Sequence, residues 1–146
     1  MYYPSYSFRQ SLKTTEFFFE SVGPKGVIQK LVSITPTGVE HTYNLALADF
    51  DPLTQSFDDR IISDNGDATK ILATIFQIVN GHLKQFPERW IVFSGNSTAR
   101  NRLYRMAINH SFQELSELFS LFGYHDDEWE TFQSNRQYEF FLVQKK

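Results

Sequence analysis

The fold of this chain is decided by the stretch Trp90-Ile91-Val92-Phe93-Ser94-Gly95-Asn96-Ser97-Thr98-Ala99-Arg100-Asn101-Arg102-Leu103-Tyr104-Arg105. Its first four residues are apolar, which is typical of a strand buried on both faces, and we place that strand at residues 89–94. Gly95 then begins a turn into an Arg-rich helix, which we place at about residues 97–109. The first backbone amides of a helix lack partners within it, so a junction of this kind is a common place to hold an anion. The residues of this helix that we expect to face inward are Ala99, Leu103, Met106 and Ala107.

A run of short strands precedes this unit. Turn signals at 23–26 (Gly-Pro-Lys-Gly) and 36–38 (Pro-Thr-Gly) separate segments that are rich in aromatic and β-branched residues. In the last of these segments Tyr43, Leu45 and Leu47 alternate with smaller or polar residues, so one face of that strand belongs to the core. We therefore predict antiparallel strands at 6–10, 16–22, 27–35 and 39–49.

The clearest helix of the chain follows a polar loop at 50–60 and a brief extended piece at 61–62. Ser63-Asp64-Asn65-Gly66-Asp67 is dense in helix-capping residues, and Asp67 in the first turn suits the helix dipole. One apolar stripe runs along residues 68–86 and stops at Phe86-Pro87. The stripe consists of Ala68, Ile71, Leu72, Ile75, Val79, Leu83 and Phe86.

The C-terminal part completes the pattern. Residues 111–114, Ser-Phe-Gln-Glu, form a capping box that opens a third helix at 111–122, with Gly123 as its C-terminal cap. Residues 124–134 are acidic and irregular, and the last strand lies at 138–143. The order predicts an α+β fold, in which an antiparallel β-meander is followed by α-β-α-α-β and a mixed sheet is flanked by helices.

Composition limits the class of protein. A length of 146 residues, with 41% hydrophobic and 16% aromatic content, predicts a single domain over residues 1–146. A net charge of −3 disfavours a globally basic nucleic-acid binder, and the lack of cysteine excludes disulfides, thiolate catalysis and Cys-ligated zinc. The N-terminus resembles no signal peptide, and no window approaches the ~18 apolar residues that span a bilayer. We therefore expect a cytoplasmic protein.

From about residue 16 onward the chain resembles a trimmed N-acetyltransferase (GNAT) superfamily domain. The loop and helix start at 63–68, Ser-Asp-Asn-Gly-Asp-Ala, follow a strand meander and are similar to the superfamily's phosphate-binding pattern of Arg or Gln, two residues, Gly, one residue, and Gly or Ala. Residues 96–104 resemble its signature of Asn, then Ala, then Leu-Tyr, and the chain closes on an apolar strand. The resemblance implies an acyl-CoA-dependent N-acyltransferase with acetyl-CoA as cofactor and Tyr104 as general acid.

The sequence departs from that pattern where the cofactor would bind. Ser63 stands in place of the expected Arg or Gln, and Asp64 and Asp67 put negative charge where a pyrophosphate would lie. Ile-Asn-His at 108–110 replaces an expected Gly-Phe, and a helix at 111–122 replaces a strand. We therefore interpret the chain first as a non-catalytic binding or regulatory module on an acyltransferase-like fold, without a cofactor. An acyl-CoA-dependent transferase with an atypical phosphate loop is the alternative.

The chain resembles a second family more closely and over most of its length, an uncharacterised bacterial family. The shared segments are Tyr-Asn-Leu-Ala at 43–46, Asn-Gly-Asp at 65–67 and the Arg-rich segment at 95–105. This resemblance implies a fold and supplies no activity, so the catalytic residues stay unknown.

The candidate ligand site is a cleft between the two helix starts, 65–67 and 95–102. Backbone amides at 94–98 suit a phosphate or carboxylate, whereas the alternative is that Asn96 or Ser97 simply caps the helix. For the segment 65–67 two interpretations likewise stay open: it is either a ligand-binding loop or a helix cap. The candidate binding residues are Asn65, Gly66, Gly95, Asn96, Ser97, Thr98, Arg100 and Arg102.

The remaining polar residues leave the partner open. Arg102 and Arg105 share a helix face and Arg100 is turned away, so they form either a solvated face or an interaction surface of helix 97–109 for nucleic acid or protein. The four histidines lack metal-ligand spacing, so we predict no metal site, and His125 belongs to a hydrated loop. An anionic small molecule or a protein is the expected partner, with nucleic acid disfavoured and no membrane.

Overall fold

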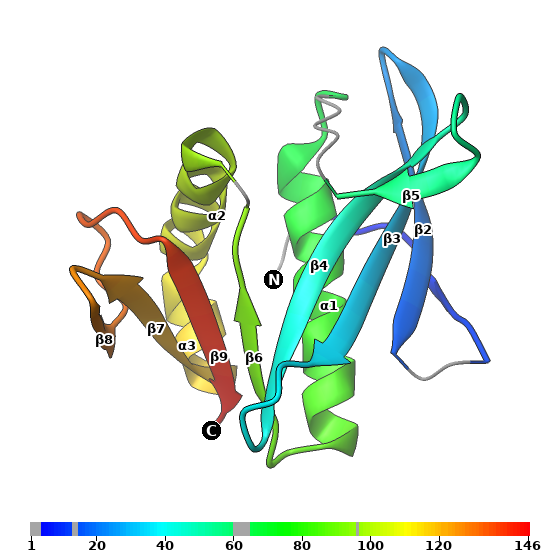
Figure 1. Cartoon of the computed structure of the whole chain (residues 1–146). Helices are drawn as coiled ribbons and strands as arrows, with labels where there is room; N and C mark the ends of the chain where they lie inside the picture. The colour runs from blue at the N-terminus through cyan, green and yellow to red at the C-terminus, as the bar shows by residue number, and fades with distance from the viewer. Residues whose placement is uncertain (1–3, 13–14, 60–64, 96) are drawn as a thin grey trace.

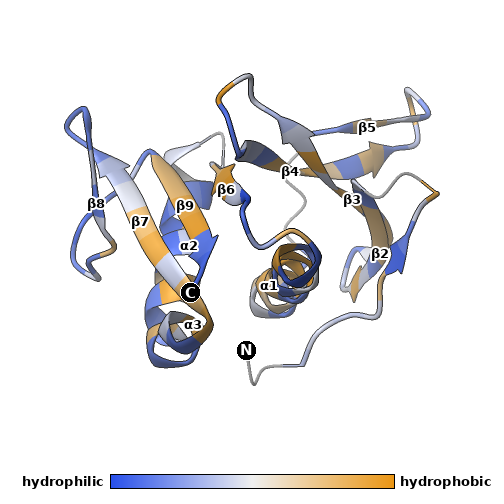
Figure 2. Cartoon of the chain, turned by 90° about the horizontal axis from the view of Figure 1, so that it is seen from below, coloured by the Kyte–Doolittle hydropathy of each residue, from blue (hydrophilic) through white to orange (hydrophobic). Residues whose placement is uncertain are grey.

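The computed structural model of the chain describes residues 4–12, 15–59, 65–95 and 97–146. Within these residues it is a mixed α+β structure in which one nine-stranded sheet carries three helices on one face (Figures 1 and 2). The strands are β1 (Arg9–Gln10), β2 (Glu16–Gly23), β3 (Gly26–Pro36), β4 (Thr42–Asp51), β5 (Ser56–Asp58), β6 (Trp90–Phe93), β7 (Phe119–His125), β8 (Glu128–Thr131) and β9 (Phe140–Lys145). The helices are α1 (Ala68–Gln85), α2 (Thr98–His110) and α3 (Phe112–Leu118).

The sheet is mostly antiparallel, with the strand order β1-β2-β3-β4-β6-β9-β7-β8 and with β5 paired to β4. The exception is the parallel pair β4 and β6, because α1 connects them as a crossover and returns the chain to the same end of the sheet. The C-terminal strand β9 lies between β6 and β7. The mixed α+β class expected from the order of elements is thus confirmed.

One hydrophobic core lies between the sheet and the helices. Alternate residues of the meander face it, such as Val32 and Ile34 of β3 and Leu45 of β4, because side chains along a strand alternate between its two faces. Helix α1 presents its apolar stripe to this surface, and α2 and α3 add Tyr104, Ile108 and Leu115. Figure 2 shows α1 beneath the curved meander and α2 and α3 beneath β9 and β7.

The structure corrects the predicted helix at 111–122. Helix α3 ends at Leu118, and residues 119–125 form β7. Gly123 is therefore a strand residue rather than a helix cap; a Cβ there would lie 2.3 Å from the Tyr138 ring. Ser111 precedes α3 without a side-chain capping bond, so the predicted capping box is also wrong. Phe119, Leu121 and Gly123 alternate into the core with the two-residue period of a strand, and β9 pairs with them.

Smaller differences concern the edges of the sheet. The expected irregular segment 124–134 contains β8, which pairs with β7 around a tight turn at Asp126 and Asp127, both at positive φ. The polar loop at 50–60 contains β5, whose Phe57 pairs with Phe50 of β4. The edge strand expected at 6–10 is shorter, at 9–10, and the extended piece at 61–62 lies outside the described residues.

Candidate functional site

The parallel strands β4 and β6 separate within the sheet. Their register ends at Leu45 opposite Phe93, and β5 joins the same edge of β4 only at Asp49. Residues 46–48 therefore have no strand partner on this edge among the described residues, although β3 pairs with them on the other edge. Figure 1 shows β4 and β6 together at one end and apart at the other.

A cleft of about 190 Å³ lies next to this opening, and we call it the helix-start cleft. It brings together residues at the start of α1 and residues 100–104 of α2 with side chains of β3 and β4; of the predicted segment 95–102, only Arg100 lines it. Its walls are largely aliphatic, with three charged groups among them. The lining residues are Lys30, Leu47, Asn65, Asp67, Ala68, Ile71, Leu72, Arg100, Leu103 and Tyr104.

Asn65 lines the cleft, but its side-chain amide is fully engaged in hydrogen bonds to the β2–β3 region. It is 2% exposed; its Oδ1 accepts a hydrogen bond from the Lys25 N–H at 2.7 Å, and its Nδ2 donates to the Gly26 carbonyl at 3.0 Å. A further bond from Nδ2 reaches Ser21 Oγ at 3.2 Å. Asn65 therefore fastens the approach to α1 onto the β2–β3 turn. Gly66 beside it is exposed at a φ of 74°, which glycine tolerates without strain.

Asp67 occupies the cap position of α1; its carbonyl accepts from the Ile71 N–H at 2.9 Å, but its side chain makes no capping hydrogen bond. The predicted place in the first turn is therefore shifted by one position, and the side chain turns to the meander instead. Its Oδ2 accepts hydrogen bonds from Tyr6 Oη and Ser21 Oγ, both at 2.5 Å, and its Oδ1 is buried without a partner in the described chain. Burial, and then the bond to Asp67, raise the pKa of Tyr6, so that hydroxyl remains a donor.

A buried ion pair lies at the floor of the helix-start cleft. Lys30 Nζ is 2.6 Å from Asp49 Oδ1, and both side chains are 2% exposed. The two residues are directly opposite each other on β3 and β4, on the face that the helices cover. Asp49 Oδ2 makes no hydrogen bond within the described residues. The polar residues at 30 and 49 continue the buried alternation of their strands, and this period is the signal by which the sequence could have revealed them.

The start of α2 confirms the capping interpretation. Ser97 Oγ accepts a hydrogen bond from the Arg100 N–H at 3.1 Å, so this residue is the N-cap. The Gly95 N–H donates to Asn101 Oδ1 at 2.7 Å, and a Cβ at Gly95 would lie 2.5 Å from the Arg100 Cβ. Gly95 is thus required by close packing of the turn on its own helix. Asn96 lies outside the described residues.

Tyr104 lies between the helix-start cleft and the core. It is 6% exposed, and its ring packs edge-on against Phe93 and Phe141. Burial raises the pKa of its hydroxyl, while the charge of Arg100 opposes that rise. The hydroxyl therefore carries its proton at neutral pH, and the ring serves as core.

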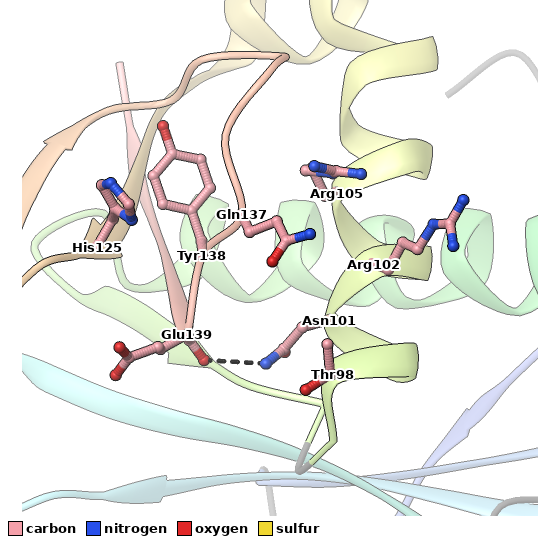
Figure 3. A pocket seen from close by; sticks show the side chains of 8 residues that line it. All are labelled: Thr98, Asn101, Arg102, Arg105, His125, Gln137, Tyr138 and Glu139. Atoms are coloured by element: carbon pink, nitrogen blue, oxygen red, sulfur yellow. Dashed lines mark hydrogen bonds between the residues drawn. The ribbon is translucent and has the colours of Figure 1, made fainter.

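Two further predicted residues, Thr98 and Arg102, line a second cavity, which we call the arginine pocket (Figure 3). Its volume is about 370 Å³. Gly66, Gly95 and Ser97 line neither cavity. Thr98 and Arg102 line the arginine pocket, whereas Arg100 lines the helix-start cleft. The cause is helical geometry, because residues two positions apart point in directions roughly 200° apart. The lining residues are Thr98, Asn101, Arg102, Arg105, His125, Gln137, Tyr138 and Glu139. Gln137, Tyr138 and Glu139 were not expected here, since no motif marks the loop that precedes β9.

Hydrogen bonds hold the two walls of the arginine pocket together. Asn101 Nδ2 donates to the Glu139 carbonyl at 3.3 Å, shown as the dashed line in Figure 3. Tyr138 Oη donates to Glu130 Oε1 at 2.7 Å and accepts from the Gln133 N–H at 2.9 Å. Burial and the Glu130 bond raise the pKa of Tyr138 to about 12. This hydroxyl is therefore uncharged at neutral pH, and its two hydrogen bonds hold the Tyr138 side chain in place.

The fold and the two pockets described above belong to a small α+β protein whose polar residues gather where a parallel pair of strands opens. The chain belongs to the Family of unknown function (DUF6934), whose model matches residues 2–146. Neither a curated protein nor a solved structure matches it. The expectation of a family of unknown function is thereby confirmed.

Two further findings concern metals and membranes. Within the described ranges, no group of three or more His, Asp or Glu side chains is placed to hold a metal ion. No helix in the described part of the chain combines the length and apolar character that crossing a bilayer requires.

Proposed function

We propose that the protein is a binding module on an acyltransferase-like fold, and that it holds the extended, uncharged part of a small ligand in the helix-start cleft. The observation that carries this proposal is the edge of β4 at residues 46–48, which has no strand partner among the described residues and lies beside a cleft that Leu47 lines. Backbone N–H and C=O groups at such an edge need partners. An extended chain that bears amide groups supplies them in the way a peptide adds to a sheet edge.

The charges of the cleft favour an uncharged segment. Lys30 is neutralised by Asp49, and the aliphatic walls suit apolar atoms. Asp67 puts a carboxylate at the start of α1, where it repels a phosphate group. Its unpartnered Oδ1 instead calls for a hydrogen-bond donor on the ligand. This balance supports a binding role over a phosphate-anchored enzyme.

The order of elements supports the acyltransferase-like part of the proposal. A strand meander leads through α1 into the parallel strand β6, which is followed by α2 and finally by an apolar strand. The sequence had suggested that a helix at 111–122 replaces a strand of the acetyltransferase pattern. Since α3 is short and β7 follows it at once, that departure is smaller than expected.

An acyl-CoA-dependent N-acyltransferase is the second candidate, and Tyr104 is the observation that favours it. Tyr104 lines the cleft, and burial raises the pKa of its hydroxyl and so keeps it protonated. In such a reaction an amine attacks the thioester carbonyl, and a general acid gives its proton to the departing thiolate. Tyr104 is the residue that would supply this proton.

Titration with acetyl-CoA tests both candidates, because its arm is extended and carries amide groups. Ala68→Trp obstructs the cleft from an exposed helix position, and Thr69→Trp is the matched control, since Thr69 is exposed and does not line the cleft. We expect saturable binding by calorimetry that Ala68→Trp abolishes and Thr69→Trp leaves intact. Equal binding by both variants would overturn the choice of cleft.

A measurement of acetyl-CoA turnover distinguishes a binding module from an enzyme. Acetyl-CoA consumption in the presence of a panel of primary amines is expected to stay at the background rate. Consumption that Tyr104→Phe lowers while binding persists would establish the transferase instead. Absence of binding at millimolar acetyl-CoA would exclude acyl-CoA as ligand in either role.

A further inference from the structure

The arginine pocket carries a second inference, independent of the helix-start cleft. We propose that it is a binding site for a small molecule bearing a carboxylate or phosphate group, held by Arg102 and Arg105. The two side chains are three residues apart on α2 and both line the pocket. Planar guanidinium groups bind carboxylate and phosphate oxygens through paired N–H donors.

Within the part of the chain that the structure describes, neither guanidinium is neutralised by a carboxylate. Among the described residues no carboxylate forms an ion pair with Arg102 or Arg105, and the one recorded bond runs from Arg105 Nη1 to the Arg136 carbonyl at 3.3 Å. Glu139 lines the same pocket, but Figure 3 shows its carboxylate directed away from both arginines. The bond to the Arg136 carbonyl leaves the charge of Arg105 uncompensated, so two cationic residues line one cavity.

Other arginines of the chain are partnered differently. Arg136 pairs with Glu130 at 3.3 Å, and Arg89 lies over the Phe86 ring at 3.8 Å. Uncompensated like charges in one concave site repel each other and are relieved when an anion enters. This contrast distinguishes the pocket from an ordinary solvated helix face.

Further donors and a rigid frame complete the site. Thr98 opens α2, where the helix dipole favours negative charge, and the Gln137 amide lies to the left of both arginines in Figure 3, on the loop that faces α2. Asn101 ties the Gly95 turn to the strand entering β9, so both walls are fixed before a ligand arrives. A site that is organised in advance loses less entropy on binding.

The surroundings favour a small anion over a nucleic acid. The turn at 125–128 carries Asp126, Asp127 and Glu128 beside the pocket residue His125, and His125 Nε2 is 3.0 Å from Asp126 Oδ2. An extended polyanion would meet these carboxylates, whereas a small ligand fits within the cavity. Two arginines could also neutralise only a few phosphates of a nucleic acid, which disfavours tight binding of such a ligand.

The test uses inorganic phosphate, pyrophosphate and malonate as probes, followed through backbone amide NMR signals of the full chain. We expect saturable shifts concentrated in residues 98–105 and 137–139. The Arg102→Gln/Arg105→Gln double variant should weaken binding at least about tenfold, since charge-assisted bonds are lost. The Lys25→Gln/Lys84→Gln double variant is the control, because it removes the same two charges from exposed positions outside the pocket.

Several outcomes would overturn the proposal. Shifts that rise without saturation, or that spread over the whole surface, would indicate non-specific attraction. Equal weakening by both double variants would assign the effect to net charge alone. Binding of a DNA duplex that needs both arginines and falls steeply with salt would replace the small ligand by nucleic acid. Both arginines are at least partly exposed, so the variants should keep the circular dichroism spectrum and melting temperature of the parent.

Discussion

The buried pair of Lys30 and Asp49 allows the sharpest test of how the cleft is built. Lys30→Met keeps the length and apolar stem of the side chain and removes its charge. The Asp49 carboxylate then loses its one recorded partner, because its Oδ2 already lacks a hydrogen bond in the described chain. Replacement of one member of a buried pair leaves an unpaired charge in a medium of low polarity.

The magnitude follows from the geometry. Both side chains are 2% exposed and the two atoms are 2.6 Å apart, so solvent cannot replace the lost partner. We expect Lys30→Met to lower the free energy of unfolding by about 3–5 kcal/mol. At about 2–4 °C per kcal/mol, the melting temperature of a domain of this size should fall by roughly 10 °C.

The matched double variant is Lys30→Met/Asp49→Leu, which removes both charges and puts apolar side chains in their place. Since burial of two ions opposes their attraction, this variant should lie within about 1 kcal/mol of the parent or exceed it. Urea unfolding followed by circular dichroism measures the parent, the two single variants Lys30→Met and Asp49→Leu, and the double variant. If the double variant is as unstable as the two single changes added together, the residues act independently and the reasoning from the ion pair fails.

Three further predictions concern packing and pH. Gly123→Ala should destabilise the fold by about 3 kcal/mol, because its Cβ would lie 2.3 Å from the Tyr138 ring; a change within 0.5 kcal/mol in urea would contradict that contact. Gly81→Ala should stabilise the fold by about 1 kcal/mol in the same assay, because a Cβ added at this position meets no atom within 4 Å and alanine is a better helix former than glycine. A loss of stability would show that the added methyl group is crowded. Burial, and then the charge of Arg89, lower the pKa of His82 to about 4, so the unfolded chain binds the extra proton. Stability should therefore fall on the order of 2 kcal/mol as pH drops from about 6.5 to 4, and His82→Gln should abolish that part of the pH dependence of the urea midpoint.

The early elements could be predicted because their signals are local. The turn residues at 23–26 mark the β2–β3 hairpin, and the apolar stripe of 68–86 marks α1 to within a residue. The parallel pairing of β4 with β6 follows once a helix is placed between two strands. Each of these inferences uses neighbours in the sequence and needs no knowledge of distant packing.

The C-terminal part could not be predicted in the same way, because distant contacts decide it. Residues 119–125 fit a helical stripe and a strand equally well until β9 supplies a partner for Phe119 and Leu121. Gly123 suits a helix cap by type, and only Tyr138 shows why a strand needs glycine there. Edge strands such as β5 are too short to leave a pattern.

The candidate site shows how a continuous motif divides in space. The segment 95–102 is one run of polar residues, yet α2 turns Arg100 toward the helix-start cleft and Arg102 toward the arginine pocket. The two cavities are chemically unlike, since one has aliphatic walls and a neutralised ion pair and the other collects uncompensated cations. A search for one anion site along this segment therefore combines two sites with different ligands. The uncharged arm of a ligand belongs to the side of Arg100, and an anion belongs to the side of Arg102 and Arg105.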